Sequence, residues 1–140
     1  MTPRKSLVVL LDTNFLLIPI RFGVDIQSEL RRVVEASFIP AITPAVVDEL
    51  KRLQEKVSPS EEKEISYALA FAKTITLLDD TLNPGEKVDD QLLRLAHRDG
   101  YLVATTDADL RRKLREKGLP VVFLRQTRHL AIEGMIKSIF

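Results

Sequence analysis

Two aspartates stand directly after apolar segments, where their carboxylates could take part in chemistry. Asp12 follows the run Leu7 to Leu11, and Asp107 follows the segment Tyr101 to Thr105. Both segments have the composition of a strand that is buried on its two faces. Because ligands of parallel sheets bind at the carboxyl ends of the strands, the two side chains are candidates for one shared site. Aspartate also caps helices and stabilises turns, so each position alone has an ordinary structural explanation.

Glu49 is a third candidate because of its position on a predicted helix. With about 100° per residue, Glu49 lies about 60° from Val46 at the centre of the apolar face, whereas Asp48 points almost opposite. A carboxylate at the edge of an apolar face is costly unless a cation or hydrogen-bond donors meet it, which favours Glu49 as a ligand. The alternative is an ion pair with Arg52, three residues further along the same helix.

Asp89 and Asp90 stand together at the start of another predicted helix. On the helical wheel Asp89 lies nearer the apolar face, which favours it as the inward ligand and leaves Asp90 a supporting or capping role. The alternative is that both simply stabilise the positive end of the helix dipole.

Together these acids suggest a metal site at one edge of a sheet. Clustered carboxylates repel one another, so they persist together only when they are protonated or neutralised by a cation. A set of oxygen ligands without His or Cys suits hard ions such as Mg²⁺ or Mn²⁺. Such ions activate water and stabilise charge on a phosphoryl group. The proposed set is Asp12, Glu49, Asp89 and Asp107.

Positive charge is concentrated towards the end of the chain. Residues 1–93 hold 11 Lys/Arg and 15 Asp/Glu, a net of −4, and residues 94–140 hold 10 and 5, a net of +5, which together give the overall +1. A basic surface of this kind would contact nucleic-acid phosphates with salt-dependent affinity, and the alternative is a solvated helix face. The predicted phosphate-contacting residues are Arg111, Arg112, Lys113, Arg115 and Lys117 on one helix, with Arg94, Arg98, Arg125 and Arg128 elsewhere.

The elements that must position these residues alternate between strand and helix. Strands are expected over 7–11, 38–42, 74–78, 101–105 and 121–124, and helical segments over 15–22, 26–34, 44–56, 59–72, 89–99 and 110–117. After Arg125, Leu130 and Ile132 alternate as in a strand, whereas Met135, Ile136 and Ile139 suit a helix. This order predicts a three-layer α/β/α domain with a central parallel sheet of about five strands.

Length and composition exclude several classes of protein. The 140 residues predict a single domain over residues 1–140, large enough to fold around its own core. The absence of cysteine excludes thiol nucleophiles, thiolate metal sites and disulfides. The apolar runs are far shorter than the roughly 20 residues that span a bilayer. We therefore expect a cytoplasmic protein with no membrane anchor.

Four motifs resemble the acidic motifs of PIN domains. They are Asp12-Thr13-Asn14 after a hydrophobic strand, Glu49 in Val47-Asp48-Glu49-Leu50, Asp89 in Asp89-x-x-Leu92-x-x-x-Ala96, and Thr105-Thr106-Asp107. The resemblance covers essentially the whole chain. Within the family, residues 11–17, 88–93, 103–110 and 122–126 are similar to the branch that holds the nucleolar nuclease of small-subunit ribosomal RNA processing and its archaeal VapC-like relatives.

The resemblance implies an endoribonuclease that uses one or two Mg²⁺ or Mn²⁺ ions and leaves 5′-phosphate and 3′-hydroxyl ends. It assigns Asp12, Glu49, Asp89 and Asp107 to catalysis and metal binding. Asp90 and Asp109 are further candidate ligands. Thr13, Asn14 and Thr105 would orient the acids through hydrogen bonds. The partners that it implies are RNA, an antitoxin or ribosome-assembly factors, and a second copy of the chain.

Other functions fit the sequence less well. Aspartyl-phosphate enzymes usually need a second acid two residues after the first, where this chain has Asn14. A receiver domain would need a lysine after the fifth strand, where this chain has Arg125. A non-catalytic RNA- or protein-binding module remains the main alternative, although no aromatic platform for base stacking is evident among the scattered Phe and Tyr residues. The sequence leaves open whether a nuclease would act as a toxin or in ribosomal RNA processing.

Overall fold

A six-stranded sheet forms the centre of the fold. The computed structural model describes residues 6–136. The strands lie in the order β3-β2-β1-β4-β5-β6, and all neighbouring pairs are parallel except β5 and β6. Their bounds are β1 Leu7–Leu11, β2 Phe38–Ile42, β3 Thr76–Leu77, β4 Leu102–Ala104, β5 Val121–Arg125 and β6 His129–Glu133. The predicted α/β/α class with a central parallel sheet is confirmed, although the pair of β5 and β6 is antiparallel.

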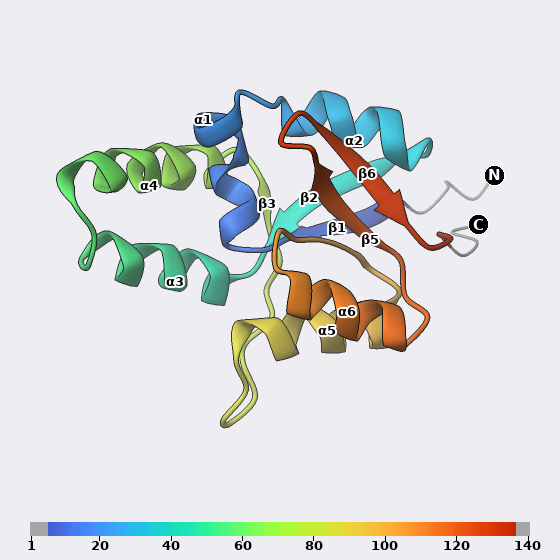
Figure 1. The fold of residues 1–140 in the computed structure, drawn as a ribbon. Coiled ribbons are helices and arrows are strands. Elements are labelled where there is room, and N and C mark those ends of the chain that lie inside the picture. Colours follow the sequence, from blue (N-terminus) through green and yellow to red (C-terminus); the bar gives the residue numbers. More distant parts are fainter. Residues whose placement is uncertain (1–5, 137–140) are drawn as a thin grey trace.

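Helices cover both faces of this sheet. Figure 1 shows α5 and α6 on one face and α1 and α2 on the other, while α3 and α4 form a hairpin that projects from the end of the sheet. This arrangement gives the α/β/α layers and places α3 at the end where the parallel strands finish. The helical bounds are η1 Asn14–Leu17, α1 Ile18–Phe22, α2 Ile26–Val34, α3 Pro44–Gln54, α4 Pro59–Ala72, α5 Val88–Asp99 and α6 Ala108–Glu116.

Capping residues fix where several helices begin and end. The Asp25, Thr43 and Ser58 side chains each accept a hydrogen bond from a backbone N–H of the first turn of α2, α3 and α4. Proline occupies the first position of α3 and of α4, where its missing N–H costs nothing. Gly100 ends α5 in the left-handed conformation, with φ of 71°. These starts and stops confirm the sequence signals.

The end of the described chain differs from the simplest expectation. Beyond Arg125 the chain turns back as the antiparallel strand β6, a sixth strand, and Met135 and Ile136 are not helical. Gln126 and Thr127 both adopt φ of 55°, and Arg128 N–H donates to Arg125 C=O at 3.2 Å, as in a tight hairpin turn. Ile139 lies outside the described residues. Elsewhere, α3 ends at Gln54 rather than Lys56, and β3 keeps only two of its five predicted residues.

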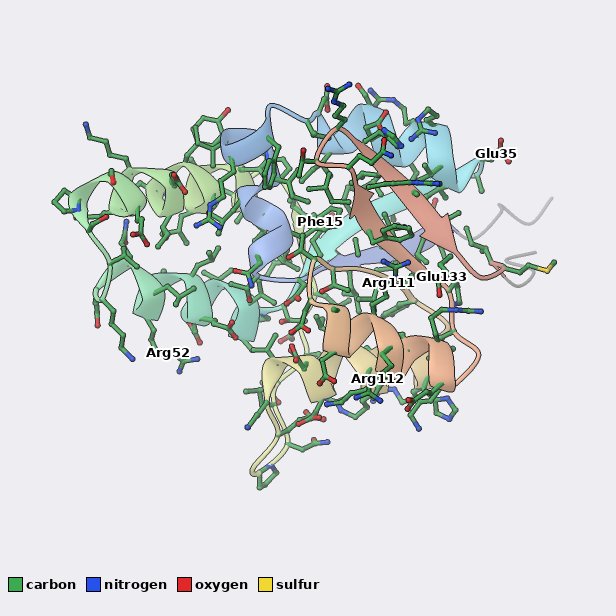
Figure 2. The ribbon with its side chains drawn as sticks, viewed as in Figure 1. Phe15, Glu35, Arg52, Arg111, Arg112 and Glu133 are labelled. Carbon is green, nitrogen blue, oxygen red and sulfur yellow. The ribbon has the colours of Figure 1, made fainter. Side chains whose placement is uncertain are left out.

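The core lies between the sheet and its helices. β1 is central and largely buried, and Phe15 of η1 is fully buried beside it (Figure 2). Leu10 pairs with Ala41 of β2 on one side and with Val103 of β4 on the other, so the carboxyl end of β1 is held between two parallel strands. Among residues 6–136, no helix is long and apolar enough to span a membrane.

Candidate active site

Asp12 is fixed at the carboxyl end of β1. Its backbone N–H continues the sheet by donating to Ala104 C=O at 3.0 Å. Only 5% of its surface is exposed. Carboxylate oxygen Oδ1 accepts from Thr13 N–H at 2.7 Å, and Oδ2 accepts from the Thr105 hydroxyl at 2.7 Å. The carboxylate is therefore oriented from two sides, and Thr105 has the supporting contact that the resemblance implied.

Asp107 is joined to Asp12 through the same hydroxyl. The Asp107 backbone N–H donates to Thr105 Oγ1 at 2.9 Å, so one threonine oxygen contacts both segments. Asp107 Oδ1 also caps α6, accepting from the N–H groups of Asp109 and Leu110 at 2.8 and 3.2 Å. Asp107 therefore caps α6 and can also belong to the group of acids at the candidate site.

The carboxylates of Asp12, Glu49, Asp89 and Asp107 are close enough to influence one another. Burial is the main cause that raises the pKa of Asp12, and the charges of Glu49 and Asp107 raise it further. The pKa of Asp89 is also raised, first by burial and then by the charges of Asp12 and Asp107. Four separate elements supply these carboxylates: β1, α3, α5 and the start of α6. The structure thus brings together the four acids singled out in the sequence.

The orientation of α3 agrees with the helical wheel. Glu49 is half-buried, and Asp48 is exposed. Arg52, the local partner considered for Glu49, is exposed and extends away from α3 (Figure 2). No ion pair joins Glu49 to Arg52 among the described residues. The carboxylate of Glu49 therefore lacks the helix-surface pair that would explain its position without a ligand.

Asp90 and Asp109 have other partners in the structure. Asp90 Oδ2 accepts from Lys87 N–H at 3.3 Å and so caps α5. Asp109 Oδ1 pairs with Arg112 at 2.6 Å and its Oδ2 pairs with Lys113 at 3.2 Å, which lowers the pKa of Asp109. Asp89 is half-buried whereas Asp90 is exposed, so Asp89 is the better placed of the adjacent pair.

The donor set suits a hard divalent cation, although it is not a ready-made cage. All four groups are carboxylates, and two of them have pKa values raised by burial and mutual repulsion, which a bound cation would relieve. The buried Thr13 hydroxyl beside them has no hydrogen-bond partner. Yet no three Asp, Glu or His side chains within residues 6–136 stand at the spacing of direct metal ligands. A cation at this site would therefore need side-chain adjustment or bridging water.

The predicted basic surface is largely paired with acids. Figure 2 shows Arg111 directed from α6 towards the sheet and Glu133, and Arg112 directed away from the sheet. Arg112 pairs with Asp109 and Glu116, both at 2.6 Å. Arg115 Nε lies 3.3 Å from Glu133, and Lys113 pairs with Asp109. The four residues predicted to bind RNA, Arg111, Arg112, Lys113 and Arg115, thus lie on different faces of α6, each beside an acid.

Gln91 is a structural link between the helices that carry Glu49 and Asp89, and no sequence pattern singled it out. It is fully buried on α5. Its Oε1 accepts from the Thr43 hydroxyl at 2.9 Å, and that same hydroxyl caps α3. Its Nε2 donates to the carbonyl and the carboxylate of Asp80 at 3.1 and 3.0 Å. A glutamine within a helix carries no local signal of such a bond, because its partner lies 48 residues away.

Comparison with known proteins gives consistent relatives. The chain is 31% identical to the protein named ribonuclease VapC4 of Methanocaldococcus jannaschii, over 89% of this chain and 95% of that one. It is 30% identical to the rRNA-processing protein FCF1 homolog of Mus musculus, over 86% of this chain but only 59% of that protein. A solved structure titled as the PIN domain endonuclease Utp24 superposes with a TM-score of 0.74 at 27% identity, covering 92% of both chains.

A family model described as "PIN like domain" matches residues 9–127, the segment that contains all four acids. The arrangement of the sheet, the gathering of carboxylates at its carboxyl end and these matches agree, and the chain belongs to the PIN domain family.

Proposed function

We propose that this chain is an endoribonuclease that depends on Mg²⁺ or Mn²⁺. The observation that carries the proposal is the gathering of four carboxylates around buried Asp12, with raised pKa values for Asp12 and Asp89. Such a group of acids is costly to fold and is typical of a functional site. The names of the relatives, a ribonuclease and an rRNA-processing protein, support RNA as the substrate.

In this proposal Asp12, Asp89 and Asp107 hold the cation, with Glu49 as a further ligand directly or through water. When bound, a divalent cation supplies activated water and offsets negative charge on the phosphodiester. The Thr105 hydroxyl and the Thr13 N–H hold the Asp12 carboxylate in one orientation. The Asp107 carboxylate is fixed by the first turn of α6. These contacts reduce the reorganisation that the acids would need when RNA binds.

The names of the same relatives support two biological settings. One is named as a VapC ribonuclease and another as an rRNA-processing protein, of which this chain spans 59%. The matching partners would be an antitoxin in the first setting and ribosome-assembly factors in the second. A second function, RNA binding without cleavage, is favoured by one observation: no three acids in residues 6–136 are spaced as direct metal ligands.

A cleavage assay separates the two functions. Total RNA and ribosomal RNA are incubated with the protein in Mg²⁺ and, separately, in Mn²⁺, and the variants Asp12→Asn and Glu49→Gln are compared with wild type. Asp48→Asn is the matched control, because it removes the same charge from an exposed neighbouring position on α3. We expect cleavage by wild type and by Asp48→Asn, and a loss of about a thousandfold for Asp12→Asn, which corresponds to several kcal/mol of lost charge stabilisation.

Equal cleavage by wild type and Asp12→Asn would disprove the assignment of the site. RNA binding with no cleavage in either ion would instead establish the second function. Calorimetric titration with Mn²⁺ provides a readout that does not depend on RNA, and Asp12→Asn should weaken that binding while Asp48→Asn should not.

A further inference from the structure

A hollow of about 440 Å³ lies beside the acidic site. One wall comes from η1 and α1 and includes Asn14, Ile18 and Phe22. The opposite wall comes from the loop after β4, from α6 and from β5. Its volume lies within the range of pockets that hold small ligands or single groups of larger ones.

The hollow is continuous with the site of the proposed reaction. Thr105, whose hydroxyl donates to Asp12, is one of its lining residues. Asn14 stands two residues after Asp12, and Ala108, also in the lining, directly follows Asp107. A chain of nucleotides with one phosphate at the acids would therefore place a neighbouring nucleotide at the opening of the hollow.

The walls carry the groups that bind nucleobases. Phe22 is 44% exposed at the end of α1 and lines the hollow. On the opposite wall the guanidinium of Arg111 lies 3.6 Å from the centroid of the Phe123 ring. Aromatic rings and arginine planes are the surfaces on which unpaired RNA bases stack. Asn14 is exposed beside them and offers both a donor and an acceptor to a base edge.

The pairing of Arg111 indicates stacking rather than phosphate binding. Its Nε donates to Glu133 at 3.2 Å, and Nη2 contacts the same oxygen, so an acid already compensates its positive charge. The ion pair and the ring together hold the guanidinium in one plane. A fixed and neutralised plane suits the uncharged face of a base better than an anionic phosphate.

We propose that this hollow is a subsite for one unpaired base of single-stranded RNA, next to the phosphate that the acids would engage. The base would enter between the side chain of Phe22 and the stacked pair of Arg111 and Phe123. This inference rests on the proposed function for its choice of RNA. It makes Phe22 of α1, Phe123 of β5 and Arg111 of α6 the determinants of which nucleotide is preferred beside the cut.

The test uses binding without metal or cleavage. A short single-stranded RNA that carries the fluorescent base 2-aminopurine is titrated with the full chain in EDTA, and fluorescence reports stacking. We expect quenching with wild type and about tenfold weaker binding for Phe22→Ala, which is the size expected from the loss of one stacked base. Phe22→Trp should restore binding, because it returns an aromatic face.

Two control variants separate stacking from general loss of surface. Ile20→Ala truncates an exposed apolar side chain of the same helix, and Tyr67→Ala truncates an exposed aromatic side chain on α4, and neither residue lines the hollow. Both should bind within twofold of wild type. Thermal unfolding checks that every variant is folded. The proposal would be overturned if Ile20→Ala bound RNA as weakly as Phe22→Ala, or if Phe22→Ala bound RNA as tightly as wild type.

An abasic RNA gives a more direct comparison. Removal of the base at the quenched position should weaken wild-type binding, and Phe22→Ala should then add no further loss, because both changes remove the same contact. Additive losses would overturn the subsite. The subsite and the nuclease activity can fail separately. If the protein cleaves RNA but Phe22→Ala binds RNA as wild type does, only the subsite is refuted. If RNA binding quenches the fluorescence but no cleavage occurs, only the proposed nuclease activity is refuted.

Discussion

Acidic side chains around α5 occupy two opposite electrostatic environments. Asp80 and Glu86 surround Arg94, whose Nη2 lies 2.8 Å from Asp80 Oδ2 and 2.9 Å from Glu86 Oε1. The hydrogen bonds from Arg94 are the main cause that lowers the pKa of both carboxyl groups. Asp89, on the same helix, has a raised pKa, as does Asp12, because burial and neighbouring carboxylates oppose their charge.

The difference separates an acid that stabilises the fold from an acid that the fold tolerates. The carboxylates at Arg94 have their countercharge within the chain, so folding satisfies them. Asp12 and Asp107 have hydrogen-bond donors, but none of the four acids of the candidate site has a paired cation among the described residues. A like-charged cluster of this kind is what a site for an external cation requires. The following variants test that contrast.

Arg94, Asp80 and Glu86 form the paired set. The largest expected change in stability comes from removing Arg94, the cation of this set. Arg94→Met keeps most of the side chain's length but leaves Asp80 and Glu86, which are 17% and 11% exposed, without their main partner. We expect a loss of about 3 kcal/mol in the free energy of unfolding, because charges that are largely buried are left uncompensated. Urea unfolding at pH 7 measures this loss.

Arg98→Ala is the matched control for that variant. Arg98 is also on α5 and pairs with Asp99 at 2.8 Å. It lies 3.9 Å from Asp80, a more distant contact than that of Arg94, and its side chain is 57% exposed. Its removal should change the free energy of unfolding much less than the removal of Arg94 does, as is usual for surface pairs. Equal losses for the two arginines would show that the Arg94 cluster is an ordinary surface network, and the contrast with the acidic site would then fail.

A smaller loss of stability is expected from Gln91→Leu. Gln91 contacts Asp80 of the paired set and Thr43, which caps the helix that carries Glu49. Leucine keeps the volume but removes the acceptor of the buried Thr43 hydroxyl and the donor to Asp80. We expect a loss of about 2 kcal/mol, since a buried polar group is left without its partner. Thr43→Val tests the reason, although it also removes the cap of α3. The double variant should lose less stability than the sum of the two single variants, because both single variants break the same bond.

Sequence patterns predicted most of the fold because its signals are local. Caps such as Asp25 and Thr43, and the apolar run of β1, act within a few residues of where they are read. The tight turn between β5 and β6 was not predictable in this way. Gln126 and Thr127 adopt positive φ without the Gly or Asn that usually marks such a turn, so pairing with β5 determines the turn there.

The acidic positions could be predicted, whereas the groups that surround them could not. Asp12 and Asp107 follow strands, and the order of residues along the chain is enough to recognise that position. The bond from Thr43 to Gln91 and the shared hollow of Phe22 and Phe123 join residues far apart in the chain. For the same reason, the scattered aromatic residues of the sequence did not indicate the stacking surface that we propose. The ion pair between Arg111 of α6 and Glu133 could likewise not be read from the sequence, because Glu133 belongs to another element, β6.

The smallest expected effect is the acid dependence of the paired set. A lowered folded-state pKa means that Asp80 and Glu86 contribute stability that is fully present above their unfolded pKa values of about 3.9 and 4.3. That contribution is lost as the pH falls through the lowered folded-state pKa values, when both groups become protonated. The gap in unfolding free energy between wild type and Arg94→Met should therefore be constant from pH 7 to about 5 and should narrow below about 4. Urea unfolding at a series of pH values measures it, and the acidic site, which both proteins share, cancels in the difference. A gap that stays the same down to pH 3 would mean that Arg94 stabilises the fold by packing its apolar stem rather than by holding two charges.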